Sequence, residues 1–157
     1  MTYDPGVIGA LGTKIYIGTT ASSGAADTYL EIKNVESIST FGRNYTIVKF
    51  TALSDGAVQK FKGEFDDGDI KVGVGRDVGD PGQAACVAAR DYTGAAYYNF
   101  KIVFNDQSTA TAAHGTKFLF KGKVTAFTTT IGTTQSPVKG ELTVAIKSGS
   151  IQETAAA

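Results

Sequence analysis

The chain has 157 residues, 15 of them basic and 15 acidic, a net charge of zero, and 42% hydrophobic residues. This length fits a single domain, and zero net charge gives no broad electrostatic reason to hold a polyanion or an anionic membrane. The single cysteine, Cys86, excludes an intrachain disulfide and a zinc site built from several thiolates. The sequence lacks a signal peptide pattern and any run of about 20 apolar residues, so we expect no membrane insertion and a cytoplasmic protein.

Alternating apolar residues predict several strands in the first half of the chain. Thr13–Thr19 and Asp69–Gly75 both alternate apolar residues with polar or glycine positions, as half-buried strands do. Tyr29–Ser39 predicts another strand, in which the alternation changes register near Asn34. We expect one continuous strand with a bulge at that point.

A hairpin is predicted over residues 45–65. Tyr45–Phe50 and Val58–Phe65 have strand character, and the intervening Ser54-Asp55-Gly56 is a turn sequence. The tip is polar and holds few residues that could anchor it in a core, so we expect it to project as a contact arm. The candidate contact residues are Thr51, Ala52, Leu53, Ser54, Asp55, Gly56, Ala57, Val58 and Gln59.

One helix is predicted, over residues 81–91. Asp80 is suited to cap its start, Pro81 to its first turn, and Gln83 follows three residues after the cap. Gly94 lies beyond its end, and four of the six residues at 84–89 are alanines. This narrow surface favours a helix that lies close against a sheet.

Three strong strands complete the chain, followed by a loose tail at residues 148–157. The strands are Tyr98–Phe104, Thr116–Thr130 and Val138–Lys147. Their alternation places Phe100, Phe104, Phe118 and Phe120 in the core, and Lys117, Lys121 and Lys123 on the outer face. We therefore predict a single, mainly β domain over residues 1–157, a β-sandwich or partly rolled β-barrel with one flanking α-helix.

No group of residues has the pattern of a catalytic or cofactor site. The glycine-rich segment 73–79 lacks the glycine spacing and the parallel βαβ unit of a dinucleotide site. His114 lies in a polar loop without a serine-elbow motif elsewhere, and Cys86, among alanines, is expected to be a buried packing residue. We expect no enzymatic activity, no cofactor and no metal.

Four acidic residues gather directly after the hairpin: Glu64, Asp66, Asp67 and Asp69. Their spacing lacks the ligand series and closing glutamate of an EF-hand, so a solvated turn is the simplest interpretation. A calcium site and a negatively charged assembly surface are the alternatives.

The order of the elements resembles the tail tube (major tail) proteins of long-tailed, non-contractile phages and related phage-like particles. The shared layout is an early strand pair, a long hairpin, a capped helix at Asp80-Pro81-Gly82-Gln83, and strong final strands. The stretches that carry it are Gly82-Gln83-Ala84 through Tyr98-Asn99-Phe100-Lys101, and Phe120-Lys121-Gly122-Lys123-Val124 with Pro137-Val138-Lys139-Gly140.

This resemblance implies a structural virion protein of the tail, made in the cytoplasm of a host bacterium. Its copies would form hexameric rings that stack into a hollow tube, through which DNA passes without specific binding. Tape-measure and tail-terminator proteins are the implied partners. In the resembled family, a long loop and the terminal arms connect neighbouring rings. The corresponding segments here are the loop at residues 51–59 and a flexible N-terminal arm at residues 1–12. Inward carboxylates would repel phosphates, so Glu64, Asp66, Asp67 and Asp69 are candidate channel-facing or inter-ring residues.

Two other functions stay open from the sequence. A tube subunit of a contractile or secretion machine shares the same architecture and differs in what surrounds the tube. A β-sandwich module that binds carbohydrate or a host surface is the second. The lack of tryptophan counts against sugar stacking, whereas Tyr97 and Tyr98 are compatible with it.

Overall fold

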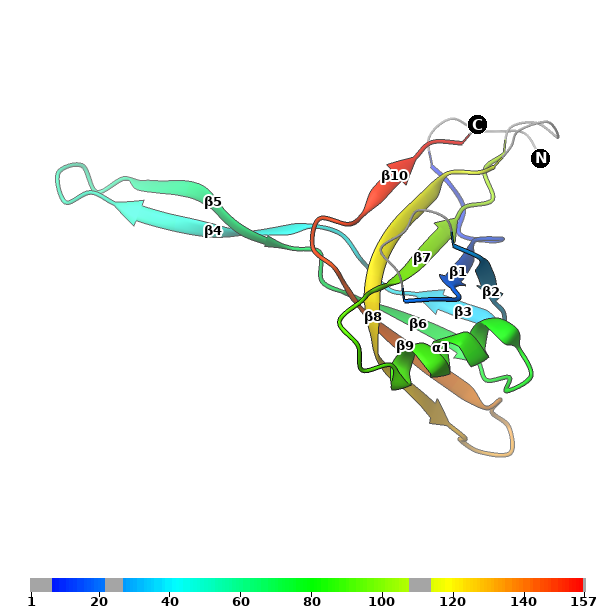
Figure 1. Ribbon diagram of the computed structural model, residues 1–157. Helices are drawn as coiled ribbons and strands as arrows, with labels where there is room; N and C mark the ends of the chain where they lie inside the picture. The colour runs from blue at the N-terminus through cyan, green and yellow to red at the C-terminus, as the bar shows by residue number, and fades with distance from the viewer. Residues whose placement is uncertain (1–6, 22–26, 108–113, 157) are drawn as a thin grey trace.

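A computed structural model describes residues 7–21, 27–107 and 114–156, and it shows a curled β domain with one helix and one long projecting hairpin (Figure 1). The elements are β1 Lys14–Gly18, β2 Tyr29–Ile32, β3 Val35–Ile38, β4 Asn44–Thr51, β5 Val58–Asp66, β6 Asp69–Gly75, α1 Pro81–Asp91, β7 Tyr98–Val103, β8 Lys117–Thr130, β9 Lys139–Ile146 and β10 Gln152–Thr154. The prediction of a mainly β domain with one flanking helix is confirmed.

Eight strands form one antiparallel sheet in the order β2-β1-β7-β8-β9-β6-β3, with β10 paired to β8 off this path. The strands β2 and β3 lie at opposite ends of the order, yet only Lys33 and Asn34 separate them in the chain. The sheet must therefore curl until its two ends approach each other, although it does not close into a barrel.

The prediction of one continuous strand over Tyr29–Ser39 is wrong. Asn34 has a φ of 60°, a left-handed conformation that a short polar side chain tolerates, and it turns the chain between β2 and β3. The two strands then pair with different partners, β2 with β1 and β3 with β6. The change of register in the sequence marks a corner of the domain.

The core lies between the inner face of the curled sheet and α1. Phe100 and Phe120 are buried there with their rings stacked at 5.3 Å between centroids, as predicted, whereas Phe104 and Phe118 are partly buried against the core. Because the pairing of β8 with β9 shifts register near residue 125, Phe127 is also buried. Each fully buried large apolar side chain contributes roughly 1.5–3 kcal/mol to folding.

The helix begins at a cap that also holds the sheet. The Oδ2 atom of Asp80 accepts hydrogen bonds from the backbone N–H of Gln83 and from that of Lys33, both at 3.1 Å. The first bond satisfies a helix donor that has no partner within the helix, as predicted for this cap. The second bond joins the helix start to the corner between β2 and β3.

Gln83 makes further links from the same helical turn, and its side chain is completely buried. Its Oε1 atom accepts hydrogen bonds from the backbone N–H of Asp77 at 3.0 Å and from Nη1 of Arg76 at 3.1 Å. Its Nε2 atom donates to the carbonyl oxygens of Lys33 at 3.2 Å and Gly75 at 2.9 Å. One amide thus binds the helix to the end of β6 and to the β2–β3 corner.

The chain ends differ in part from the predictions. Residues 152–154, expected to be loose, form β10, which pairs with residues 117–119 of β8. Residues 1–6 of the predicted N-terminal arm lie outside the described residues. In the described ranges, no helix is long and apolar enough to cross a membrane.

Candidate functional site

The hairpin of β4 and β5 projects away from the domain as a separate arm (Figure 1). These two strands pair only with each other, in a two-stranded sheet of their own. None of their residues is buried. An isolated two-stranded hairpin is marginally stable in water, so this arm lacks the packing that would make it stable by itself.

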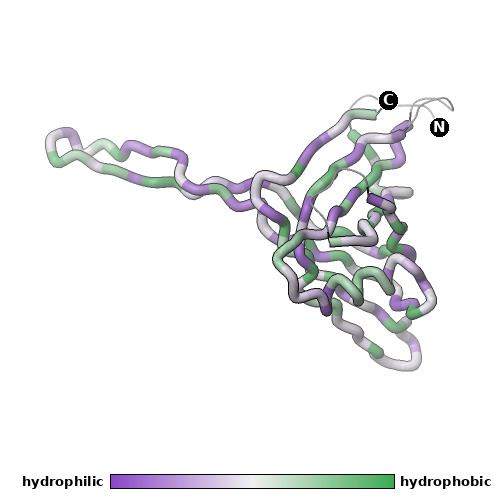
Figure 2. The backbone as a smooth tube through the Cα atoms, in the orientation of Figure 1, coloured by the Kyte–Doolittle hydropathy of each residue, from purple (hydrophilic) through white to green (hydrophobic). Residues whose placement is uncertain are grey.

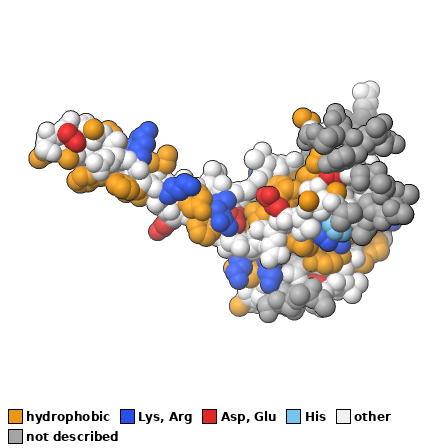
Figure 3. Space-filling view, turned by 90° about the horizontal axis from the view of Figure 1, so that it is seen from above, with side chains coloured by type: hydrophobic (Ala, Val, Ile, Leu, Met, Phe, Trp, Pro, Cys, Tyr) orange, Lys and Arg blue, Asp and Glu red, His pale blue; other side chains and the backbone are white. Residues whose placement is uncertain are grey.

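Large apolar side chains occur along the whole length of the arm, where Figure 2 shows alternating hydropathy and Figure 3 shows exposed hydrophobic groups. The exposed large apolar residues are Tyr45, Ile47, Val48, Phe50, Leu53, Val58, Phe61 and Phe65. Their exposed fractions run from 42% to 107%. A run of exposed apolar side chains of this kind marks a surface that contacts another protein.

The two faces of the arm differ in chemistry. In the register of the hairpin, Val48 lies opposite Phe61 and Lys49 lies opposite Lys60, and the two pairs point to opposite faces. Phe50 shares the face of the first pair, which we call the apolar face, and Lys62 shares the face of the lysine pair, which also holds Ile47 and Val58. Two lysines directly opposite each other destabilise a hairpin, so this pair lowers the stability of the arm when no partner covers it.

The tip of the arm, at residues 51–59, forms a defined turn. The backbone N–H of Gly56 donates to the carbonyl of Ala52 at 3.0 Å, and Gly56 has a φ of 66°, which favours glycine. The carboxylate of Asp55 accepts a bond from the backbone N–H of Ala57 at 3.0 Å. All tip residues except Ala52 are exposed, and Leu53 is fully exposed.

An ion pair between the exposed Arg43 and the buried carboxylate of Asp67 fixes the root of the arm. Nε of Arg43 lies 3.0 Å from Oδ1 of Asp67, whose side chain has no exposed surface. The backbone N–H of Gly149 donates to the other carboxylate oxygen at 2.7 Å, and the Arg43 guanidinium lies 4.3 Å from the centroid of the Phe65 ring. The hydrogen bond to Asp67 raises the pKa of Arg43. These contacts join the start of the arm to the turn after β5 and to the segment after β9.

The four acidic residues predicted at this root have different environments. Glu64, Asp66 and Asp69 are exposed, and the carboxylate of Asp66 accepts a hydrogen bond from the backbone N–H of Gly68 at 2.9 Å. Asp67 is the exception, because its buried carboxylate has no surface to face a channel or another ring. In the described part of the chain, no three acidic, histidine or cysteine side chains are placed to hold a metal.

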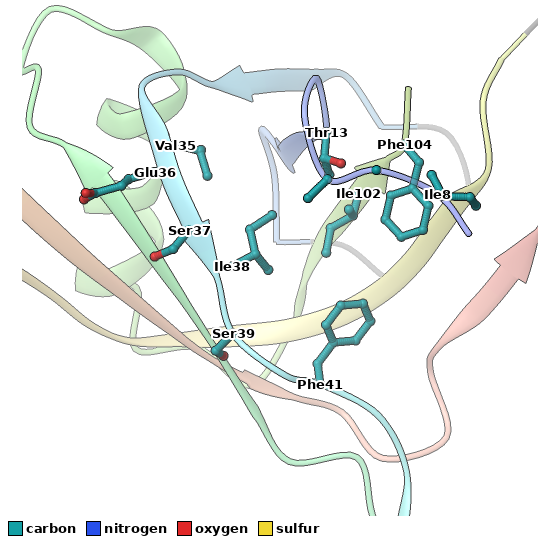
Figure 4. Close-up of a pocket in the computed structure, with 12 residues that line it drawn as sticks. Ile8, Thr13, Val35, Glu36, Ser37, Ile38, Ser39, Phe41, Ile102 and Phe104 are labelled. Atoms are coloured by element: carbon teal, nitrogen blue, oxygen red, sulfur yellow. The ribbon is translucent and has the colours of Figure 1, made fainter. Parts of the chain in front are cut away.

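A cavity of about 320 Å³ opens at the edge of the domain, between β3 and β7 (Figure 4). The side chains of Ile38 and Phe41 lie on one side, and those of Ile102 and Phe104 on the other. Glu36 is the one ionisable lining residue, and its carboxylate accepts a hydrogen bond from Lys139 at 2.9 Å. The cavity is thus an apolar surface without an acid–base pair among the residues that line it.

The two residues considered as reactive groups occupy structural positions. Cys86 is fully buried on α1, which confirms its predicted packing role, and burial raises the pKa of its thiol to about 12. A thiol with this pKa carries almost no thiolate at neutral pH and is a poor nucleophile. Nδ1 of His114 lies 2.8 Å from the carbonyl oxygen of Gly115, in the loop where the sequence placed it.

No protein-family model and no curated protein matches this sequence. Solved structures do match it in fold over most of the chain. A chain of the PVC sheath–tube complex, from an extracellular contractile injection system in its extended state, matches with a TM-score of 0.70 and 12% identity, over 95% of this chain and 92% of that chain.

Two further matching structures come from particle tails. A chain from the tail of an empty GTA particle, solved with C6 symmetry, matches with a TM-score of 0.62 and 16% identity, over 90% of this chain and 95% of that chain. A chain of the SPP1 tail tube matches with a TM-score of 0.61 and 11% identity, over 95% of this chain and 81% of that chain. The domain, arm included, therefore has the fold found in the tube proteins of phage-like particles.

Proposed function

We propose that this chain is a structural subunit of the tail tube of a long-tailed, non-contractile phage or phage-like particle. Its copies form rings, the rings stack into a hollow tube, and DNA leaves through the tube without specific binding. The observation that carries the proposal is the arm, which exposes eight large apolar residues along its length and has no core of its own.

In this tube, the apolar face of each arm packs on a surface of another copy that is not itself an arm, so the contact is heterologous. Heterologous contacts close into rings or continue as stacks, and a tube needs both kinds. The C6 symmetry of the GTA tail supports six copies in each ring.

We assign contacts in this tube to the tip of the arm, the N-terminal arm and three exposed carboxylates. The tip at residues 51–59 contacts the next ring, and the N-terminal arm at residues 1–12 is a second bridge. Exposed carboxylates at Glu64, Asp66 and Asp69 face the channel or an adjoining ring, where they would repel DNA phosphates or meet basic groups. A tape-measure protein and a tail terminator are the further partners, and a matched chain from a PVC sheath/tube terminator supports the second.

The experiment that tests this function removes the apolar face of the arm without touching the core. The variant Phe50→Ser with Phe61→Ser should keep the thermal unfolding temperature of the domain, because both side chains are more than half exposed. It should remain unassembled in negative-stain microscopy under conditions in which the unmodified chain makes tubes. Val78→Ser, which removes a side chain 79% exposed outside the arm, is the matched control and should assemble.

Deleting residues 52–58 tests the tip separately. We expect a folded chain that makes no stacks, because the tip contact between rings is lost. Tubes of ordinary length from this deletion would assign the stacking contact to another segment.

A tube subunit of a contractile machine is the second candidate, favoured by the match to the PVC sheath–tube complex. The two candidates differ in whether a second protein layer surrounds the tube. Producing this chain together with the proteins encoded beside its gene and imaging the particles separates them. A bare tube supports the non-contractile tail, and a contractile sheath around the tube refutes it.

A further inference from the structure

Eight of the twelve lysines lie on the outer face of the sheet, Lys71 and Lys139 on β6 and β9 and the other six close together. These six project from the outer face of β1, β7 and β8, opposite the buried side, and from the residue that follows β9. The members of this lysine face are Lys14, Lys101, Lys117, Lys121, Lys123 and Lys147. The register places them together, since Lys14 and Lys117 both pair with Val103, and Lys101 lies on the strand between. The result is a continuous basic surface.

Tyrosine rings hold several of these ammonium groups in place. Nζ of Lys101 lies 4.7 Å from the ring centroid of Tyr16 and 4.6 Å from that of Tyr29. Nζ of Lys123 and Nζ of Lys147 lie 4.9 Å and 5.3 Å from the ring centroid of Tyr97. These cation–π contacts restrict the lysine side chains, so the face is ordered before it meets a partner.

The lysine face has few carboxylates of its own. In the described ranges, the ion pair found on it joins Lys14 to Glu31 at 3.8 Å. Burial lowers the pKa of Lys101, and the charge of Lys117 on the neighbouring strand adds to this effect. A surface of this kind gains most from a partner that supplies carboxylates.

Three exposed carboxylates of the same chain gather at the root of the arm, and one of them, Asp69, lies on the outer face of the sheet two strands from Lys123. Because the net charge is zero, the excess of lysine on this face is balanced by acidic residues elsewhere. Glu64, Asp66 and Asp69 at the root of the arm are exposed, and the ion pairs found in the described ranges do not include them. We call these three residues the root acids.

We propose that the lysine face docks on a second copy of this chain, against its root acids Glu64, Asp66 and Asp69. The inference rests on the proposed function and names one of its contacts. The two surfaces consist of different residues, and the contact that we assign to them is heterologous, so it repeats from copy to copy. Opposite charges also fix the orientation in which the copies meet.

A second copy fits this face better than a nucleic acid does. Proteins that bind nucleic acid usually carry a net positive charge, and this chain is neutral. The tyrosine rings on the face are covered by lysine ammonium groups, so they are not open for bases to stack on them.

Charge reversal of both surfaces tests the contact. One variant carries Lys117→Glu with Lys123→Glu, and the other carries Glu64→Lys with Asp69→Lys. Each variant alone should lower the amount of sedimenting tube at least about tenfold, because like charges then meet at every contact. An equimolar mixture of the two should assemble again, since every contact between unlike variants has opposite charges. Lys33→Glu, compared with Lys123→Glu alone, makes the same charge change at the exposed corner between β2 and β3, away from both surfaces, and should assemble.

The outcomes separate the inference from the proposed function. If the unmodified chain makes tubes and the Lys117/Lys123 variant makes as many, the inference is overturned and the tube function stands. If the mixture does not assemble, the pairing of these two surfaces is also overturned. An unmodified chain that never assembles contradicts the tube function and the inference with it. Fluorescence anisotropy with a short labelled DNA tests whether the lysine face binds nucleic acid instead. If the unmodified chain binds this DNA and the Lys117/Lys123 variant does not, the face is a nucleic-acid site and the inference is overturned.

Discussion

Replacing Gln83 by leucine should destabilise the folded chain without affecting the surfaces that we assign to assembly. Leucine has a similar volume but neither donates nor accepts a hydrogen bond. The variant therefore loses all four side-chain bonds of Gln83, to Lys33, Gly75, Arg76 and Asp77. Three of these bonds are made with backbone groups, and they connect the helix to the sheet.

The expected loss in the free energy of unfolding depends on the number of these hydrogen bonds and on how exposed the bonded groups are. A typical hydrogen bond contributes about 1 kcal/mol net, and a buried group left without a partner costs about 1–3 kcal/mol. Lys33 and Asp77 are exposed residues, so water replaces part of what they lose. We expect a loss of about 3 kcal/mol in the free energy of unfolding. For a chain of this length, that corresponds to about 6 to 12 °C in Tm.

Thermal unfolding followed by circular dichroism measures this change. Ala84→Leu is the matched control, because it adds the same side chain at the next, exposed position of α1 and should leave Tm nearly unchanged. A Gln83→Leu variant with Tm within about 2 °C of the unmodified chain would show that the amide is not a structural link.

Two further predictions concern the thiol and the root of the arm. Because burial raises the pKa of Cys86 from 9.0 to about 12, the folded chain keeps this proton longer than the unfolded chain does, and stability should fall as pH rises through this range. Native Cys86 should also resist a thiol reagent near neutral pH and react after denaturation; equal rates would contradict its burial. Asp67→Asn should speed tryptic cleavage after Arg43, since the ion pair that holds this residue is lost, whereas Asp69→Asn should not. Mass spectrometry of timed digests compares the two variants.

Much of the fold could be predicted because the signals are local. Alternation identifies β6, β7, β8 and β9 within a residue or two, and Asp80 with Pro81 places the helix start where the structure has it. The pairing of strands is not local in this way. The conformation of Asn34 separates β2 from β3, and nothing in the alternation distinguishes that corner from a bulge.

The site could be predicted only in outline, for the same reason. The turn at residues 54–56 predicts a projecting tip, but β4 has apolar residues on both faces, a pattern that is also typical of a buried strand. Asp67 has the sequence context of a solvated turn, and its burial depends on Arg43, which lies 24 residues earlier in the chain. The contacts of Gln83 reach 50 residues back, to Lys33.

The arm and the lysine face share a physical feature that connects local structure to assembly. Each is unfavourable in a solitary chain, the arm because it exposes apolar side chains, and the face because it places six lysines close together. Contact with another copy relieves both. The two contacts depend differently on salt, because screening weakens the contact between lysines and root acids but does not weaken the burial of apolar surface. Assembly that uses both therefore takes its strength mainly from the arm and its orientation mainly from the charges.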